Sequence, residues 1–284
     1  RDLHSFPTRR SSDLVVIGVH APLAVRLATV RRYLPGVKLV GWIHNSFEAL
    51  FSPTSLYIGP DRQRHYVYQF RKLYATVVLC HHDADSYRSY DARFEPTVIY
   101  NPLTLEPGRR AQEGSKRFLA VGRFSRRHKG FDLLIEAFHL FARQDSEWVL
   151  DIVGEGEEAG LYQSLIERYG LEGRVCLHPF TSNIQQYYSA AQVYVLSSRW
   201  EGFGLVLVEA MAHGLPVVSS DLPTSLEIMG DYGIYFRNGD VSDLARSLLV
   251  ATQMNWEEKS AQADAIVRRF DVSEITAQWL RLVS

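Results

Sequence analysis

Two glutamates, Glu201 and Glu209, flank a turn that contains Gly202 and Gly204. An apolar run at residues 193–196 precedes the turn and is typical of a buried strand, and a helical pattern follows it. Backbone N–H groups and the positive end of a helix dipole at such a turn favour a phosphate. The carboxylates cannot hold a phosphate, but they make strong hydrogen bonds with hydroxyl groups. The stretch therefore predicts a ligand with phosphates in its middle and hydroxyls at both ends, which is a sugar nucleotide.

Three more segments follow predicted strands, at residues 123–129, 154–156 and 180–182. In an open α/β sheet, ligands bind beyond the carboxyl ends of the strands. Arg123 offers a planar fork and Lys129 a point charge, and both suit phosphate oxygens. We interpret Arg126 and Arg127 as solvated residues of a basic loop. The four segments together predict one binding edge on the sheet.

The pair of glycines in Gly154-Glu155-Gly156 is a weaker signal, since two glycines after a strand often form only a tight turn. The dinucleotide-binding fingerprint needs a third glycine, and Ala159 stands at that position. We therefore do not predict a nicotinamide cofactor.

Two groups in the first third of the chain allow more than one interpretation. His44 ends a predicted strand, so both a structural and a functional role stay open. The segment from His81 to Asp85 has ligand-type residues for a metal, but it also begins a helix, where aspartate is a common cap. We favour the cap over the metal site.

Strands and helices alternate in two series, at residues 14–100 and from residue 118 onward. Each series predicts a parallel sheet covered by helices. The polar stretch at residues 103–115 is interpreted as an interdomain linker, with a long surface loop as the alternative. In the first series, a helix is expected over residues 21–33 with one apolar face, made of Leu23, Leu27, Val30 and Leu34.

The composition indicates a globular protein, with 284 residues, 46% of them hydrophobic, and a net charge of −1. This charge gives no general case for nucleic acid as a partner. Cys80 and Cys176 lie in apolar runs and are expected to be free thiols in a reducing compartment. No apolar run reaches the roughly 18 residues that a transmembrane helix requires.

Residues 1–14 have no periodicity and lack the apolar centre of a signal peptide. Their sequence, RDLHSFPTRRSSDL, is similar to the in-frame translation of a sequencing-library adapter. We therefore expect a disordered artefact here and a gene that begins upstream. A natural disordered tail is the alternative.

The motifs of the second series resemble a known family in their order. Glu201 to Glu209 is similar to the E-x7-E motif of retaining GT-B glycosyltransferases, in glycosyltransferase family 4 (glycosyl transferases group 1). The supporting matches are Val121-Gly122-Arg123, Lys129 to Leu134, Val153 to Gly156, Glu209 to Val218 and Ser220-Asp221. Before the linker, the likeness rests only on Trp42-Ile43-His44 and residues 98–102. Two departures are the spacing from Arg123 to Lys129, longer by one residue than the commonest form, and His213 in place of a small residue or cysteine.

The resemblance implies a role for each matching residue. Arg123 and Lys129 would bind the donor diphosphate and stabilise its leaving charge. Glu201 would contact hydroxyls of the transferred sugar, Glu209 would hold the ribose, and His44 is similar to a histidine that reaches the donor sugar. The remaining donor contacts are expected at the turn residues Gly122, Gly154 and Glu155, at the base-side loop Phe180-Thr181-Ser182 and at the backbone of Phe203, Gly204 and Leu205. The family retains the anomeric configuration by front-face displacement without a metal, so no metal or other cofactor is expected.

The resemblance implies a GT-B architecture, in which two Rossmann-like domains with parallel sheets face each other across a cleft. We expect an incomplete acceptor-side domain at residues 15–104, a linker at 105–116, a donor domain at 117–270 and a helix at 271–284 that crosses back. The expected activity is that of a hexosyltransferase that uses a nucleoside-diphosphate sugar, with UDP as the expected nucleotide. The acceptor would be a glycan or a lipid-linked molecule of bacterial envelope polysaccharide synthesis. The expected location is the cytoplasm, including the inner face of the membrane. A sugar-nucleotide epimerase or phosphorylase of the same fold, or an inactive donor-binding fragment, is the alternative.

Overall fold

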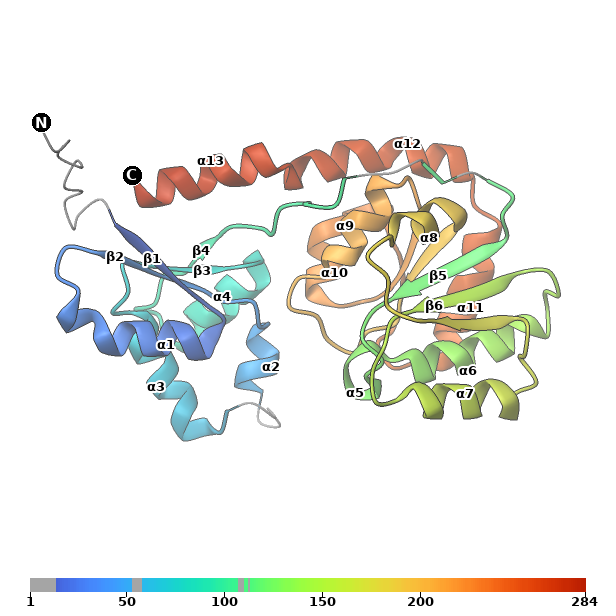
Figure 1. Ribbon diagram of the computed structural model, residues 1–284, viewed down its shortest axis with the longest axis horizontal. Helices are drawn as coiled ribbons and strands as arrows, with labels where there is room; N and C mark the ends of the chain where they lie inside the picture. Colours follow the sequence, from blue (N-terminus) through green and yellow to red (C-terminus); the bar gives the residue numbers. More distant parts are fainter. Residues whose placement is uncertain (1–13, 53–57, 107–109, 112) are drawn as a thin grey trace, which may run out of the picture. The chain divides into compact units, whose positions relative to one another are not determined.

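The computed structural model describes residues 14–52, 58–106, 110–111 and 113–284, so the adapter-like segment up to residue 13 lies outside the described residues. The chain forms two compact units, and the first consists of Arg1–Asn101 with Ser273–Ser284. The second unit is Pro102–Val272. The boundary thus lies just before the linker that the sequence predicted, and the last helix belongs with the first unit (Figure 1).

In the described part of unit 1, parallel strands lie in the order β1-β2-β3-β4. The strands are β1 (Val15–Val19), β2 (Lys38–Trp42), β3 (Ala75–Val78) and β4 (Thr97–Val98). The helices are α1 (Ala21–Val30), the 3-10 helix η2 (Arg31–Tyr33), α2 (Phe47–Phe51), α3 (Pro60–Phe70), α4 (His81–Tyr90) and α13 (Val272–Val283). Helices α1 and α3 pack on one face of the sheet. On the other face, Ile275 and Trp279 of α13 pack against Val40 and Val77.

Helix α1 does not bury the face that its sequence predicted. Its buried residues are alanines, including Ala24, whereas Leu23 is 47% and Val30 41% exposed. The cause lies in the strands beneath, because a Cβ added at Gly41 would be 3.0 Å from the Cβ of Ala24. The helix lies so close to the sheet that only small side chains fit between them. The prediction was right for Leu27 and Leu34, which pack partly buried against this core.

Unit 2 contains a larger parallel sheet, whose described strands have the order β10-β9-β8-β5-β6-β7. They are β5 (Arg117–Val121), β6 (Val149–Val153), β7 (Val175–His178), β8 (Val193–Leu196), β9 (Val217–Ser220) and β10 (Ile234–Phe236). The helices are α5 (Arg126–Lys129), α6 (Phe131–Ala142), α7 (Ala159–Arg168), α8 (Gln185–Ala190), α9 (Leu205–Ala212), α10 (Pro223–Met229), α11 (Val241–Thr252) and α12 (Trp256–Val267). Two 3-10 helices complete the unit, η3 (Gly230–Tyr232) and η4 (Arg268–Phe270).

Helices α6, α7 and α11 contribute to the main core on one face of this sheet, and α8 and α9 lie on the other face (Figure 1). The register brings the strand ends together, since Val121 of β5 pairs with Val153 of β6, which pairs with His178 of β7. The residues that follow these strands therefore emerge side by side at one edge. This is the edge at which the sequence predicted binding.

No helix within the described ranges combines the length and the apolar character needed to cross a membrane.

Candidate functional site

A cavity of about 340 Å³ opens at the carboxyl edge of the unit 2 sheet. It is lined by Val121, Gly122, Arg123, Val153, Gly154, Glu155, Phe180, Thr181, Ile184 and Glu209. Most of these are residues predicted from the sequence, drawn from four separate segments. Ser182 and the turn Phe203-Gly204-Leu205 are not among the described lining residues, and Phe203 is buried.

A larger cavity of about 690 Å³ lies in unit 1, next to Val37 and the amino end of β2. Its lining includes the cations Arg31, Arg32 and Lys72. It is at the wrong end of its strands for a ligand site of an open α/β sheet. We therefore assign the functional site to the smaller cavity in unit 2.

Two glycines let the loops after β5 and β6 lie against each other. A Cβ at Gly154 would be 1.9 Å from the carbonyl oxygen of Gly122, and one at Gly156 would be 2.4 Å from that of Phe124. The Phe124 N–H donates to the carbonyl of Glu155 at 2.7 Å. The glycine pair thus permits the close backbone contact that forms the cavity wall.

The Arg123 side chain is exposed at the cavity, and no hydrogen bond or ion pair of it is found in the described part of the chain. The neighbouring Arg126 is exposed as well, but it forms an ion pair with Asp132 at 3.0 Å. Arg199 also pairs with Asp132, at 2.9 Å, and lowers the pKa of that carboxyl against the effect of its burial. Arg126 therefore supports the loop, while the guanidinium of Arg123 is available to a ligand.

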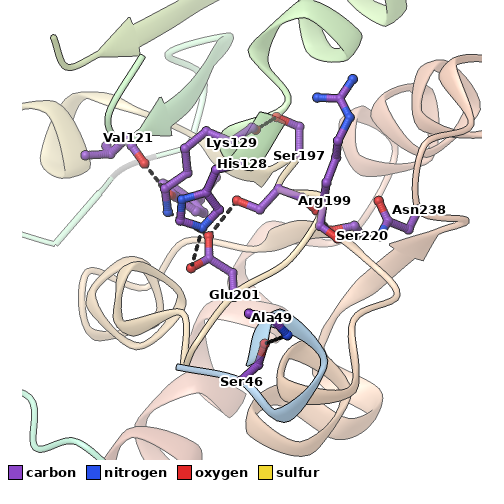
Figure 2. Close-up of polar contacts among 12 residues, drawn as sticks. Ser46, Ala49, Val121, His128, Lys129, Ser197, Arg199, Glu201, Ser220 and Asn238 are labelled. Carbon is purple, nitrogen blue, oxygen red and sulfur yellow. Dashed lines mark hydrogen bonds and ion pairs between the residues drawn. The ribbon is translucent and has the colours of Figure 1, made fainter. Parts of the chain in front are cut away.

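Glu201 lies in a network of polar contacts and is only 8% exposed. Its Oε1 accepts from Lys129 Nζ at 2.6 Å and from the Ser198 hydroxyl at 2.5 Å, and its Oε2 lies 3.7 Å from His128 Nε2 (Figure 2). Burial alone would raise the pKa of this carboxyl, but Lys129 and His128 outweigh it and lower the pKa to about 2. Glu201 is therefore ionised at neutral pH. It forms an ion pair with Lys129, although the sequence assigned these two residues to different parts of the ligand.

The backbone around Gly130 brings Lys129 to Glu201. Gly130 has a φ of 63° and joins α5 to α6, and a Cβ there would be 2.2 Å from the carbonyl oxygen of Ser197. The Ser197 hydroxyl donates to the carbonyl of Lys129 at 2.9 Å (Figure 2). The start of α6 is thus held against the end of β8, next to Glu201.

The His128 ring stacks on Trp200, with ring centres 3.8 Å apart and planes 9° from parallel. This contact fixes the imidazole beside Glu201. Sequence reasoning missed both His128 and Ser198 as part of the site. The available signals were that Ser198 follows a buried strand and that His128 directly precedes Lys129.

Glu209 lies on α9 and reaches the cavity, where its Oε2 accepts from the Tyr188 hydroxyl at 2.8 Å. Burial raises the pKa of Glu209, and the bond from Tyr188 and the charge of Lys129 only partly offset it. The Tyr188 ring in turn stacks on His213, with centres 4.9 Å apart. Nothing in the spacing of the sequence indicated Tyr188, which comes from the short helix α8.

Removing the Tyr188 hydroxyl is expected to destabilise unit 2. In Tyr188→Phe, the half-buried carboxyl of Glu209 loses its donor, which should lower the free energy of unfolding by about 1.5–3 kcal/mol near neutral pH. Urea denaturation would measure this. Tyr187→Phe is the matched control, because the Tyr187 hydroxyl has no hydrogen bond among the described residues. Equal losses in the two variants would contradict the prediction.

His44 follows β2 in unit 1, with its ring centre 4.4 Å from Trp42 and 5.0 Å from His20. Burial, and to a lesser degree the charge of His20, lower its pKa to about 4, so the imidazole is neutral at physiological pH. Its Nε2 is buried and has no partner within the described residues. A contact of His44 with the donor stays a prediction.

The segment from His81 to Asp85 begins helix α4, as predicted, but the cap is not an aspartate. The N-cap residue is Cys80, whose sulfur accepts from the Asp83 N–H at 3.4 Å. The Asp83 carboxylate instead accepts from Phe47 N–H at 2.8 Å, at the first residue of α2. Asp83 thus joins two helices within unit 1.

Comparison with known proteins bears on this site. A model of the family described as "Glycosyl transferases group 1" matches residues 105–267. An "uncharacterized glycosyltransferase" of Haemophilus influenzae is 29% identical over 64% of this chain and 53% of its own length. The "lipopolysaccharide core biosynthesis mannosyltransferase LpsB" of Rhizobium meliloti is 31% identical over 54% of this chain and 42% of its own.

Among solved structures, a variant of Staphylococcus aureus TarM in complex with fondaparinux, alpha-GlcNAc-glycerol and UDP has a TM-score of 0.77. It is 22% identical and covers 88% of this chain, which covers 52% of it. This likeness bears on the fold alone. Together with the two parallel α/β units, it confirms the GT-B fold class. The chain spans about half the length of the relatives that it matches.

Proposed function

This chain belongs to the family of glycosyl transferases group 1, and we propose that it moves a sugar from a nucleoside diphosphate to an acceptor, with retention of configuration. The observation that carries the proposal is the cavity at the carboxyl edge of the unit 2 sheet. A free guanidinium, Arg123, and a carboxyl, Glu209, line it together, so it offers partners for both phosphates and hydroxyls.

The donor would lie along this edge. Arg123 would hold the diphosphate by charge-assisted hydrogen bonds, and Glu209 would accept hydroxyls of the ribose. The base would lie near Thr181 and Phe180. Phe180 is 68% exposed, so its ring can stack on a flat partner. UDP is the nucleotide that we propose, and the TarM variant described with UDP supports this choice.

The Glu201 network would serve the transferred sugar and the leaving group. The ionised Glu201 can accept sugar hydroxyls on the lone pairs that Lys129 and Ser198 leave free. As the glycosidic bond breaks, negative charge develops on the diphosphate, and fixed cations stabilise it without reorganisation. Arg123 and Lys129 would supply these cations, so we propose transfer without a metal. Membership of glycosyltransferase family 4 is part of the same proposal.

The acceptor that we propose is a glycan or a lipid-linked intermediate of the bacterial envelope. The relative named for lipopolysaccharide core biosynthesis supports this choice of acceptor. Because that relative is named a mannosyltransferase, it also supports a hexose as the transferred sugar. We propose that the sugar transfer takes place on the cytoplasmic side, with the protein attached peripherally to the membrane.

Replacing Arg123 with alanine tests the diphosphate assignment. The variant should bind UDP about ten- to a hundredfold more weakly, because a charge-assisted contact worth about 1.5–3 kcal/mol is lost. Titration calorimetry with UDP would measure the affinity. Arg127→Ala is the control, since Arg127 is exposed on the nearby helix α5 but is not among the described residues that line the cavity. An unchanged affinity in the Arg123 variant would exclude the assignment.

An assay of sugar release with and without acceptor tests the reaction class. A transferase should be nearly idle on a UDP-sugar alone. Turnover that needs no acceptor would indicate an epimerase, and turnover that depends on free phosphate would indicate a phosphorylase. UDP binding without any transfer would indicate that this chain is a donor-binding fragment.

A further inference from the structure

A second polar cluster lies on the unit 2 sheet, and the proposed reaction does not use it. Asp151 of β6 pairs in register with Cys176 of β7, and His178 follows two residues later on the same strand. Their neighbours Leu150, Ile152 and Val175 belong to the main hydrophobic core. Because side chains alternate along a strand, the cluster points to the opposite face. One potential ligand atom from each of the three residues lies within 4.8 Å of the other two.

The contacts within the cluster orient its donor atoms. The Arg117 guanidinium donates to Asp151 Oδ2 at 2.7 Å, and His178 Nε2 lies 2.7 Å from Asp151 Oδ1. The carboxylate is nearly buried, whereas Cys176 and His178 are half-buried on the outermost described strand of the sheet. No hydrogen bond of the Cys176 thiol is found in the described part of the chain. The Cys176 sulfur is thus a potential metal ligand beside an oriented carboxylate and an imidazole.

We propose that Asp151, Cys176 and His178 form a binding site for one divalent transition-metal ion, with zinc as the expected ion. A thiolate and an imidazole favour zinc over magnesium or calcium, which take oxygen ligands. Three protein ligands leave the fourth position of a tetrahedral ion to water. Zinc bonds of about 2.0–2.3 Å require donor atoms roughly 3.3–3.8 Å apart. Asp151 Oδ1 and His178 Nε2, which lie 2.7 Å apart, must therefore separate by roughly half an ångström and give up their contact, while the Cys176 sulfur moves closer to both.

Metal binding has a simple proton balance. The ion replaces the Cys176 thiol proton, which leaves to solvent, and binds the lone pair of His178 Nε2 in the tautomer that carries the ring proton on Nδ1. Asp151 would bind through Oδ1 while Oδ2 keeps its bond from Arg117. Arg117 would then hold the ligand in place in the way that outer partners of metal sites do. The two anionic ligands, the Cys176 thiolate and the Asp151 carboxylate, neutralise the 2+ charge of the ion.

The position of the cluster connects it to the nucleotide cavity. The carbonyl of His178 accepts from the Gly154 N–H at 2.9 Å, and Gly154, Phe180 and Thr181 line the cavity. An ion at the end of β7 would therefore fix the strand from which the base-side loop starts. This effect on nucleotide affinity rests on the proposed function, whereas the binding of the ion does not.

Cobalt titration of the whole chain, purified free of metal, tests the site. Co²⁺ should bind one per chain and show a thiolate-to-cobalt charge-transfer band, which zinc should abolish by displacement. The band should disappear in Cys176→Ser and persist in the matched control Cys80→Ser, since Cys80 is buried in unit 1. His178→Gln should weaken binding at least tenfold, with His139→Gln as its control. A band that survives Cys176→Ser, or the absence of stoichiometric binding, would overturn the proposal.

A second measurement keeps the test independent of the folding of these variants. In the unmodified chain, zinc should slow alkylation of Cys176 by iodoacetamide, read by mass spectrometry of its peptide. Cys80 serves as the internal reference. An alkylation rate of Cys176 that zinc does not change would also overturn the site. UDP affinity can then be measured with and without zinc. An affinity that zinc does not change would exclude the proposed effect of the ion on nucleotide binding, but not the metal site itself.

Discussion

Replacing Lys129 with methionine is expected to lower the free energy of unfolding by about 3–5 kcal/mol. Methionine keeps much of the length of the lysine stem but removes the ammonium that lies 2.6 Å from Glu201 Oε1. The carboxylate would then be buried with only the Ser198 hydroxyl and His128 beside it. A buried charge without its partner costs far more than the pair contributes when intact. Urea denaturation near neutral pH would measure the loss.

The same variant should change the dependence of stability on pH. In the native protein, the pKa of Glu201 is depressed to about 2, against a value of about 4.3 when unfolded. Its contribution is therefore present above the unfolded value and lost as the pH falls from about 4.3 toward 2. Without Lys129 the folded pKa rises, so this acid-induced loss should shrink or vanish in Lys129→Met.

Two further variants separate this interpretation from a general effect of losing a lysine. Lys116→Met removes an exposed partner of Glu147 and should cost at most about 1 kcal/mol. Adding Glu201→Gln to Lys129→Met removes the stranded charge and should restore part of the stability, because replacing both partners avoids the burial penalty. If the double variant had as low a free energy of unfolding as Lys129→Met alone, the stranded charge of Glu201 could not be the cause of the lost stability. Transfer activity should be lost in both variants, a result that bears on the proposed function and not on stability.

The sequence predicted the edge of the sheet at which the cavity lies, and the reason is local. A buried strand followed by glycine and a polar residue is recognisable from the chain alone, as at Gly122-Arg123 and Gly154-Glu155. Parallel strands then bring these ends together without further information. The lining of the cavity by Arg123, Gly154 and Thr181 follows from that geometry.

The sequence did not predict which side chains meet, because these contacts join distant segments. Lys129 and Glu201 are 72 residues apart and come from different elements. Their pairing depends on the close approach of Gly130 to Ser197, which hydrophobic periodicity does not encode. Tyr188 meets Glu209 for the same kind of reason, through the packing of α8 beside α9.

The error at α1 has another origin. Periodicity ranks a helix face by its hydrophobicity, so it favoured Leu23 and Val30 over the alanines. The strands beneath carry Gly18 and Gly41, and the space left between helix and sheet admits Ala24 but no larger side chain. Small residues facing glycine on a neighbouring element were the signal that would have corrected the prediction.

Asp83 is the buried carboxyl with the largest expected effect on stability in unit 1. Its residue is 1% exposed, and its carboxylate accepts from the Phe47 N–H. Burial raises the pKa to about 7, and nearby Glu48 adds to the effect, while the bond from Phe47 and the charge of His82 oppose it. The folded chain therefore holds this proton to a higher pH than the unfolded chain, whose value is about 3.9.

The sign of the pH dependence follows from this difference in proton binding. Between about pH 4 and 7 the folded state binds more protons than the unfolded state, so stability falls as the pH rises. The rise of the pKa from about 3.9 to about 7 corresponds to a cost of at most about 4 kcal/mol, which is complete above the folded pKa and absent below the unfolded one.

Replacing Asp83 with asparagine should remove this cost. The amide is neutral at every pH, and its oxygen can still accept from the Phe47 N–H. We expect Asp83→Asn to be more stable than the native chain by a few kcal/mol at about pH 8 and to differ little at about pH 4. Urea denaturation at about pH 4, 6 and 8 would measure the difference. Asp85→Asn is the control, because Asp85 is exposed, pairs with Arg88 and should have little effect on stability. If Asp83→Asn changed stability equally at all three pH values, the buried charge could not be the cause of the change. The altered hydrogen bond with the Phe47 N–H would then be the cause.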